Sequence, residues 1–197
     1  MLQHWINTVF SRPAIFTWVR AFLDDGYSVI KKVIVRELEM EKSVLDLGCG
    51  TGQFCGLFSR EQYLGIDASS RYLSYAGKKH PSYRFVVGDA AHLHLQKKVH
   101  QVLILGVLHH LPDEKVKKVL AAASGSLLRE GRLLIFEDIH RERFNPVGGL
   151  VKKFDVGKYI RTHQKYGELY RNSFEVVKDF TLSCGIADYS VYILEKK

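Results

Sequence analysis

The chain has 197 residues, which is enough for one domain with an appendage but not for two catalytic domains. Hydrophobic residues make up 46% and charged residues 25%, so the composition excludes a disordered, collagen-like or low-complexity protein. The net charge of +8 favours anions of any kind, whether nucleic acid, an acidic membrane surface or an acidic small molecule.

Residues 1–42 precede the first expected strand and have the apolar spacing of two helices that part near Gly26. Two interpretations of this N-terminal helical appendage stay open. It is either a lid that meets an apolar substrate or a membrane, or an amphipathic helix packed on the domain, which is the commoner role of an aromatic stripe. The apolar side chains concerned are Trp5, Phe10, Ile15, Phe16, Trp18, Val19, Phe22 and Leu23.

Residues 43–197 alternate short β-branched runs with segments of helical period, which is typical of a parallel sheet with crossover helices. We expect strands at 43–48, 63–67, 83–89, 101–106 and 132–138. A helix that Asp113 could cap and Gly131 follows would join the last two strands, with Val116, Val119, Leu120, Ala123 and Leu127 on one face. Two alternating runs near the C-terminus, 174–184 and 188–195, are separated by only three residues, which permits a hairpin but no parallel crossover.

Cysteine usage and the lack of targeting features indicate where the protein works. An odd number of cysteines without a Cys-x-x-Cys pair favours a reducing compartment. No apolar run approaches the roughly 18 residues of a membrane span, and no basic stretch leads into an apolar one at the N-terminus. We therefore expect a cytoplasmic protein without a transmembrane span, for which peripheral membrane contact stays open.

A glycine-rich turn follows the first strand in the sequence VLDLGCGTGQF. Glycines at 48, 50 and 52 permit a tight turn and let a ligand approach the backbone, and the start of the next helix offers unpaired N–H groups. The dinucleotide fingerprint GxGxxG would require glycine at position 53, where the chain has Gln53. The turn therefore predicts a nucleotide-like ligand without identifying it.

Two acids follow the next two strands. Asp67 ends the second strand, where a carboxylate can accept hydrogen bonds from both ribose hydroxyls of an adenosine. Asp89 ends the third strand, where it could accept from the adenine amino group while the Ala90 N–H serves a ring nitrogen. This arrangement suits a neutral or cationic adenosine ligand better than a pyrophosphate.

Five segments in order resemble the class I S-adenosylmethionine-dependent methyltransferases: DLGCGTG, YLGIDAS, GDAAHL, ILGVLHHLPD and LLREGRLLIFED. The fourth segment is similar to that of the small-molecule branch. The resemblance implies an α/β, Rossmann-like three-layer sandwich whose seven-stranded sheet has the order 3-2-1-4-5-7-6, with strand 7 antiparallel. Residues 43–197 would then be the methyltransferase domain.

The resemblance also implies S-adenosylmethionine as the cofactor and assigns residues to it. It implies that the methionine moiety is bound by the glycine turn and two further residues: Gly48, Cys49, Gly50, Asp46 and the carbonyl of Gly106. The adenosine falls to two pairs: Asp67 with Ala68 for the ribose, and Asp89 with Ala90 for the adenine. Simpler roles remain open, because Asp46 could be satisfied by loop N–H groups, Asp67 and Asp89 could cap strands, and Cys49 could be a small packing residue like Cys55.

Two departures from the family pattern bear on the substrate. His100 and Gln101 stand where the family often has an acid at the start of the fourth strand, which would weaken one loop hydrogen bond. No DPPY or NPPY follows that strand, although enzymes of this fold that methylate bases or amides carry such a motif there. The sequence therefore disfavours nucleic acid as a partner.

His109 and His110 come just after the fourth strand, at the edge where ligands bind in open α/β sheets. A neutral imidazole is a competent base near pH 7, so one of the two is the candidate catalytic base. The alternative is that both pack under the following helix or bond the backbone. No metal is expected, because His92 and His94 flank a turn without further ligands.

Residues 141–165 hold seven lysines or arginines against two acids and directly follow the fifth strand. One interpretation is a substrate lid that favours an anionic or lipid-like acceptor, and the other is a solvated basic surface. The lid residues would be Lys152, Lys153, Lys158, Tyr159, Arg161 and Tyr166.

These observations together predict methyl transfer from S-adenosylmethionine by in-line displacement to a small-molecule or lipid-like acceptor. Two other classes of protein stay open: an RNA-modifying methyltransferase, which the net charge supports, and a cofactor-binding protein without catalysis. The sequence identifies neither the acceptor atom nor the oligomeric state.

Overall fold

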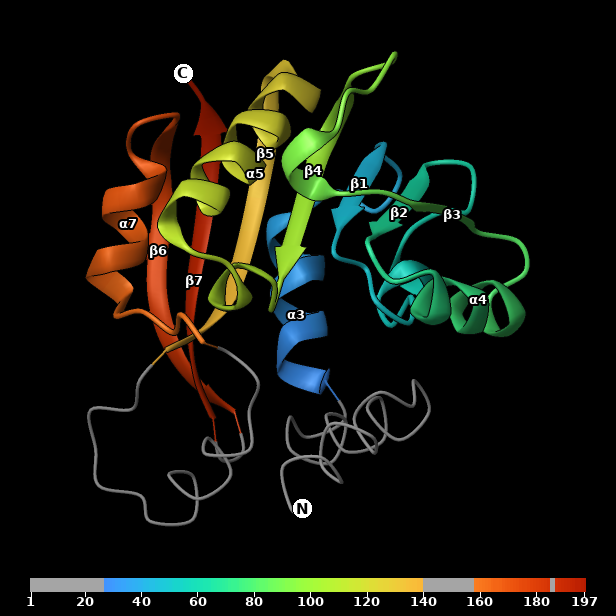
Figure 1. Cartoon of the computed structure of the whole chain (residues 1–197), viewed down its shortest axis with the longest axis horizontal. Coiled ribbons are helices and arrows are strands. Elements are labelled where there is room, and N and C mark those ends of the chain that lie inside the picture. The colour runs from blue at the N-terminus through green and yellow to red at the C-terminus, as the bar shows by residue number, and fades with distance from the viewer. Residues whose placement is uncertain (1–26, 140–157, 185–186) are drawn as a thin grey trace.

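The computed structural model describes residues 27–139, 158–184 and 187–197, which form one mixed sheet with helices on both faces (Figure 1). The strand order is β3-β2-β1-β4-β5-β7-β6, and β7 runs antiparallel to both of its neighbours. This confirms the expected seven-stranded sheet. The strands are β1 (Val44–Leu47), β2 (Tyr63–Asp67), β3 (Arg84–Val87), β4 (Val99–Leu105), β5 (Leu127–Ile139), β6 (Phe174–Cys184) and β7 (Ala187–Lys196).

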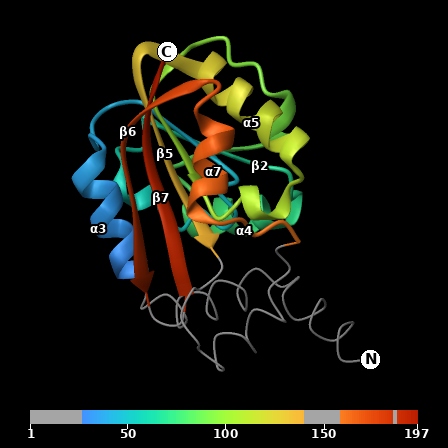
Figure 2. The same ribbon diagram turned by 90° about the vertical axis from the view of Figure 1, so that its left-hand side faces the viewer.

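Helices cover the two faces of the sheet. The helix α5 (Asp113–Ser126) and the helix α7 (His163–Tyr170) lie on one face, and α3 (Ser28–Glu37) lies on the other, as Figure 2 shows. The helix α4 (Ser70–Lys79) packs beside β2 and β3 at one end of the sheet. Short 3-10 turns follow three of the strands within the described ranges: η2 (Cys55–Leu57), η3 (Ala90–His92) and η4 (Leu108–His110).

The hydrophobic core has two halves, because successive side chains of a strand point to opposite faces of the sheet. Leu45 and Leu47 of β1 pack on the α5 side, while Val44 packs on the α3 side with Ile30 and Ile34. Burial on both faces explains why these strands are almost continuously apolar in sequence.

Residues 28–37 confirm the second of the two helices expected before the first strand, and this helix packs on the sheet through its apolar face. The first expected helix, with its aromatic stripe, lies outside the described residues. So do Lys152 and Lys153 of the basic segment. The division into an appendage and a methyltransferase domain, and the lid roles of both segments, therefore stay predictions.

The boundary between α5 and β5 differs from expectation. The helix ends at Ser126, and Leu127 already pairs with Val99 as the first residue of β5. Leu127 is fully buried in the same core as the helix, so apolar spacing alone cannot separate the two roles. Asp113 is not the N-cap either, because Pro112 holds that position and the Asp113 carboxylate accepts hydrogen bonds from Arg161 instead.

Gln101, which stands where the family often has an acid, joins β4 to the chain before β1. Its Oε1 accepts from the Glu39 N–H at 2.7 Å, and its Nε2 donates to the Glu39 carbonyl at 2.8 Å. A carboxylate could only accept, so an amide is the side chain that satisfies both backbone groups.

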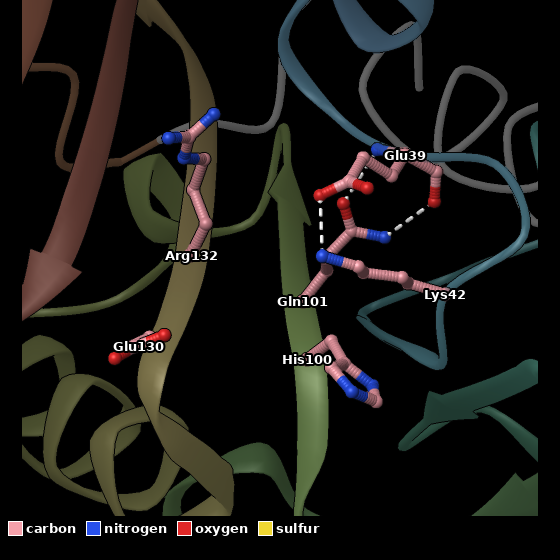
Figure 3. A pocket seen from close by; sticks show the side chains of 6 residues that line it. All are labelled: Glu39, Lys42, His100, Gln101, Glu130 and Arg132. Atoms are coloured by element: carbon pink, nitrogen blue, oxygen red, sulfur yellow. Dashed lines mark hydrogen bonds and ion pairs between the residues drawn. The ribbon is translucent and has the colours of Figure 1, made fainter.

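A polar pocket surrounds this contact, with Lys42, His100, Glu130 and Arg132 as further lining residues (Figure 3). It lies at the amino ends of β4 and β5. Ligands of open parallel sheets bind at the opposite, carboxyl ends, so this pocket is not the candidate functional site. Among the helices of the described ranges, none is long and apolar enough to cross a membrane.

Candidate functional site

The glycine turn after β1 bends through positive φ angles of 79° at Gly48, 53° at Gly50 and 70° at Gly52. A Cβ atom on Gly48 would overlap Cγ2 of Val107, so this glycine permits close packing against the turn after β4. A Cβ atom on Gly50 would meet nothing within 4 Å. Gly50 therefore presents its backbone to open space, where a ligand can approach it.

Asp67 lies directly beside that turn. Its Oδ2 accepts from the Gly50 N–H at 2.9 Å, and its Oδ1 accepts from the Ser69 N–H at 2.8 Å. A carboxylate has about two acceptor positions per oxygen, so each oxygen keeps one for a further donor. Two neighbouring hydroxyl groups match this arrangement.

Asp46 is buried in β1, and its Oδ2 accepts from the Tyr63 hydroxyl at 2.6 Å. Burial raises the pKa of Asp46 to about 7, while the hydrogen bond from Tyr63 opposes that rise and the negative charge of Asp67 adds to it. The observed partner of this carboxylate is therefore a phenol from the neighbouring strand rather than a loop N–H group.

Cys49 belongs to the glycine turn through its backbone, whose N–H donates to the Ile66 carbonyl at 3.1 Å. Its side chain is buried against β2, because a Cβ atom on Gly65 would lie 2.7 Å from the Cys49 Sγ. Cys55 is fully buried in the core on the α3 side. Both thiols occupy packing positions.

Asp89 caps η3 by accepting from the Ala91 N–H at 2.9 Å, and its other oxygen lies 3.0 Å from His92 Nδ1. The Ala91 N–H first, and then His92, hold the pKa of Asp89 below its usual range. The carboxylate stays exposed all the same. Capping the turn and accepting from a ligand are therefore compatible roles for Asp89, with Ala90 adjacent as the first residue of η3.

Glu137 organises the turn after β4, and it was missed in the sequence. This residue of β5 is fully buried. Its Oε1 accepts from the N–H groups of Val107 at 2.8 Å and Leu108 at 2.7 Å. Its Oε2 accepts from the His109 N–H at 3.2 Å and lies 2.7 Å from His109 Nδ1. The one available signal was an acid inside an apolar strand, which is unfavourable unless it is paired.

These four contacts fix the tautomer of His109. An ionised carboxylate has about four acceptor positions and no donor, and here four N–H groups fill them. Nδ1 of His109 is therefore the protonated nitrogen, and Nε2 carries the lone pair when the ring is neutral. His109 is buried and His110 is exposed, with 4.0 Å between their ring centroids.

Gly106 comes directly before residues 107–111, which we call the histidine turn. It follows β4 with a φ of 67°, and its N–H donates to the Phe136 carbonyl at 2.8 Å. A Cβ atom on Gly106 would lie 3.7 Å from Cε1 of His109. The His109 ring thus faces the backbone that the resemblance assigns to the cofactor.

Arg161 does not have the open guanidinium expected of a lid residue. Its five N–H groups are all engaged, with Asp113 Oδ1 and with the carbonyl oxygens of Leu108, Leu111 and Tyr159, at 2.7 to 3.0 Å. The residue is 7% exposed. Arg161 therefore cannot bind an anionic acceptor without giving up a partner, and its observed role is to hold the histidine turn.

The other residues expected to bind the methyl acceptor differ in their exposure. Lys158 and Tyr159 are exposed, and the Tyr159 N–H donates to the His109 carbonyl at 2.9 Å, so this pair lies beside the histidine turn. Tyr166 is fully buried, and its hydroxyl donates to the Asp138 carbonyl at 3.3 Å. Tyr166 therefore belongs to the core under α7. In the ranges 27–139, 158–184 and 187–197, no three His, Cys, Asp or Glu side chains form a metal cluster.

The comparisons with known proteins agree with this geometry. The family described as Methyltransferase domain matches residues 44–131, from β1 into β5. Demethylmenaquinone methyltransferase of Thermotoga maritima is 32% identical over an alignment of 113 residues, and the match covers 54% of this chain and 48% of that protein. The chain thus spans about half the length of this curated relative.

Two solved structures share the fold over nearly their whole length. The N-methyltransferase NodS of Bradyrhizobium japonicum, in complex with S-adenosylhomocysteine, has a TM-score of 0.76 at 11% identity, and the match covers 96% of this chain and 97% of NodS. The magnesium protoporphyrin IX methyltransferase of Synechocystis, with bound S-adenosylhomocysteine, has a TM-score of 0.72 at 16% identity, covering 98% and 99%. At these identities the likeness shows the fold.

The strand order and the likeness to these structures show the Rossmann-like fold of class I methyltransferases. The segment 44–131, which matches the Methyltransferase domain family, contains the glycine turn, Asp67, Asp89 and the turn after β4. S-adenosylmethionine is the cofactor of that class.

The raised pKa of Asp46 predicts how stability depends on pH. Between about pH 4 and pH 7 the unfolded chain releases a proton that the folded protein keeps, so the free energy of unfolding falls as the pH rises through that range. We expect Asp46→Asn to be more stable than the wild type at pH 8, by about 2 to 4 kcal/mol, with the difference vanishing near pH 4. Urea unfolding at both pH values measures the two stabilities, with the exposed Glu61→Gln as control. The same stability difference between Asp46→Asn and the wild type at pH 4 and pH 8 would contradict the raised pKa of Asp46.

The four contacts of Glu137 predict a large effect of a small change. In Glu137→Gln the amide NH₂ group would face N–H donors, leaving two of them without an acceptor. We expect a loss of about 3 to 5 kcal/mol in the free energy of unfolding. Glu130→Gln, in an exposed position of the same strand, is the matched control and should change stability by less than about 0.5 kcal/mol. Equal stabilities of the two variants in denaturant titrations would refute this account.

Proposed function

We propose that the protein transfers a methyl group from S-adenosylmethionine to a small-molecule acceptor. The observation that carries the proposal is the grouping of the open Gly50, the half-used Asp67 carboxylate and the histidine turn at the carboxyl ends of β1, β2 and β4. When bound, S-adenosylmethionine supplies an electrophilic methyl carbon on a sulfonium. The residues of the chain then have to bind the cofactor, orient the acceptor and take a proton from the acceptor.

Cofactor binding is assigned to the carboxyl ends of four strands. The two unused acceptor positions of Asp67 suit the ribose hydroxyls, and Ala68 follows it in the same turn. The exposed carboxylate of Asp89 suits the adenine amino group, with the Ala90 N–H for a ring nitrogen. The methionine moiety is assigned to the other residues that the resemblance implies: Gly48, Cys49 and Gly50 through their backbones, Gly106 through its carbonyl, and Asp46 in β1.

His109 is the proposed catalytic base. With its Nδ1 proton directed at Glu137, the neutral ring offers Nε2 to a proton of the acceptor. Glu137 also stabilises the imidazolium that would form, because its charge lies 2.7 Å away. His110, on the exposed side of the same turn, is the second candidate.

The acceptor is proposed to be a small, anionic or lipid-like molecule bound next to Lys158 and Tyr159. These two exposed side chains flank the histidine turn with one cation and one aromatic ring. The names of two similar proteins, a demethylmenaquinone and a magnesium protoporphyrin IX methyltransferase, support a small-molecule acceptor. The free, buried thiols of Cys49 and Cys55 suit the cytoplasmic location that the sequence predicts.

Cofactor binding can be tested without knowing the acceptor. At 100 times its Kd, S-adenosylhomocysteine should add about 2.7 kcal/mol of stability. That corresponds to a rise of roughly 5 to 11 °C in Tm for a domain of this size. We expect the rise in the wild type and in Glu61→Gln, which alters an exposed acid at the other end of β2, but a much smaller one in Asp67→Asn.

NAD serves as the control ligand in this measurement and should leave Tm unchanged. A shift with NAD, or none with S-adenosylhomocysteine, would overturn the proposal. Binding without turnover on a panel of acceptors would favour the non-catalytic alternative. Methylation of RNA with steeply salt-dependent binding would favour the RNA-modifying one.

The base is tested by replacing the two histidines separately. We expect His109→Asn to lower kcat about 10²- to 10⁴-fold at neutral pH without changing the affinity for S-adenosylhomocysteine, because only proton transfer is lost. His110→Asn is the matched variant and should change kcat less than tenfold. Methyl transfer is measured with radiolabelled S-adenosylmethionine and an acceptor from the panel, and normal rates in both variants would refute a histidine base.

A further inference from the structure

The histidine turn is held by opposite charges on its two sides. Its N–H groups at Val107, Leu108 and His109 donate to the carboxylate of Glu137. Its carbonyl oxygens at Leu108 and Leu111 accept from the guanidinium of Arg161. Both charged side chains are buried, and they come from different parts of the chain.

Arg161 also joins the histidine turn to the segment that carries Lys158 and Tyr159, the two exposed residues proposed to bind the methyl acceptor. One Nη1 group donates both to the Leu108 carbonyl at 3.0 Å and to the Tyr159 carbonyl at 2.8 Å. The Tyr159 N–H returns a hydrogen bond to the His109 carbonyl. A single planar group therefore sets the separation between the backbone of residues 158–161 and the backbone of the turn.

The backbone of Arg161 is itself fixed from both sides. It forms a parallel bridge with Ile139 at the end of β5. The next residue, Thr162, caps α7 by accepting from the Lys165 N–H at 3.2 Å. The first residue of α7, His163, is held through both ring nitrogens, with Nδ1 2.8 Å from Ser190 Oγ and Nε2 2.7 Å from Asp179 Oδ2. The guanidinium thus extends from a rigid base, which is what an orienting group requires.

We propose that Arg161 is a positioning residue for methyl transfer: it fixes where the histidine turn and the Lys158–Tyr159 pair lie relative to the glycine turn. The inference rests on the proposed function. Lysine cannot replace it, because an ammonium has three donors on one atom, whereas these partners require five in a planar fork. Loss of the fork would move His109 by a fraction of an ångström to an ångström, and displacements of that size cost up to about 10² in rate.

The test compares Arg161→Lys with Arg132→Lys. Arg132 is the matched control, because it also bonds a backbone carbonyl and a carboxylate, of Glu37 and Glu195, but at the opposite edge of the sheet. The first readout needs no acceptor: the ring ¹⁵N and Nδ1 proton resonances of His109 report its tautomer and its bond to Glu137. We expect them to change in Arg161→Lys and to match the wild type in Arg132→Lys.

The second and third readouts separate positioning from general damage. Affinity for S-adenosylhomocysteine by calorimetry should stay within threefold in both variants, while kcat for an accepted substrate falls 10- to 100-fold in Arg161→Lys only. In Arg161→Ala, millimolar guanidinium should restore the wild-type His109 resonances, and equal molar ammonium should not. Wild-type resonances and kcat in Arg161→Lys would overturn the inference.

The outcome for Arg161 is distinguishable from the outcome for the proposed function. If the wild type fails to bind S-adenosylhomocysteine, the proposed function fails. The His109 resonances of the ligand-free variants still show whether Arg161 sets the geometry of the turn. If the wild type binds and transfers methyl but Arg161→Lys matches it in rate, only the positioning role is refuted.

Discussion

A single buried carboxylate is the interaction on which the candidate site depends. Glu137 lies in the middle of the sheet, where an unpaired charge would be strongly destabilising, and four N–H groups from one short turn compensate it. The amides of Val107, Leu108 and His109 lie at the start of η4, where a helix leaves its first N–H groups without an internal partner. The carboxylate satisfies these amides, and the amides in turn stabilise the buried carboxylate. The same contacts that make burial of the acid tolerable also determine which nitrogen of His109 carries its proton.

The rest of the site follows from the parallel sheet. Carboxyl ends of β1, β2 and β4 meet at one edge, so the glycine turn, Asp67 and the histidine turn come together although they are far apart in sequence. The contact between Gly48 and Val107 shows how closely two of these turns approach. A side chain at position 48 would push these two turns apart.

Sequence patterns predicted the parts of the molecule that depend on local order. The expected strand at 63–67 coincides with β2, and the short connection before the last strand correctly predicted an antiparallel pairing. The sheet order that the resemblance implied was also right. Local patterns gave the wrong boundary between α5 and β5. Leu127 would be buried whether it ended the helix or began the strand, so its apolar side chain does not distinguish the two. Local patterns also failed where a role depends on distant partners: Glu137 acts on residues about thirty positions earlier and Arg161 on residues about fifty earlier. In a basic run Arg161 resembles a solvated cation, and only the carbonyl oxygens around it reveal a buried one.

The parallel bridge between Ile139 and Arg161 ties the end of β5 to the backbone that carries the guanidinium. Glu137 lies two residues earlier in the same strand, so the two charged side chains that hold the histidine turn are joined through the backbone. A shift of this end of β5 would therefore displace both charges in the same direction, and the turn would move as one body instead of being pulled apart.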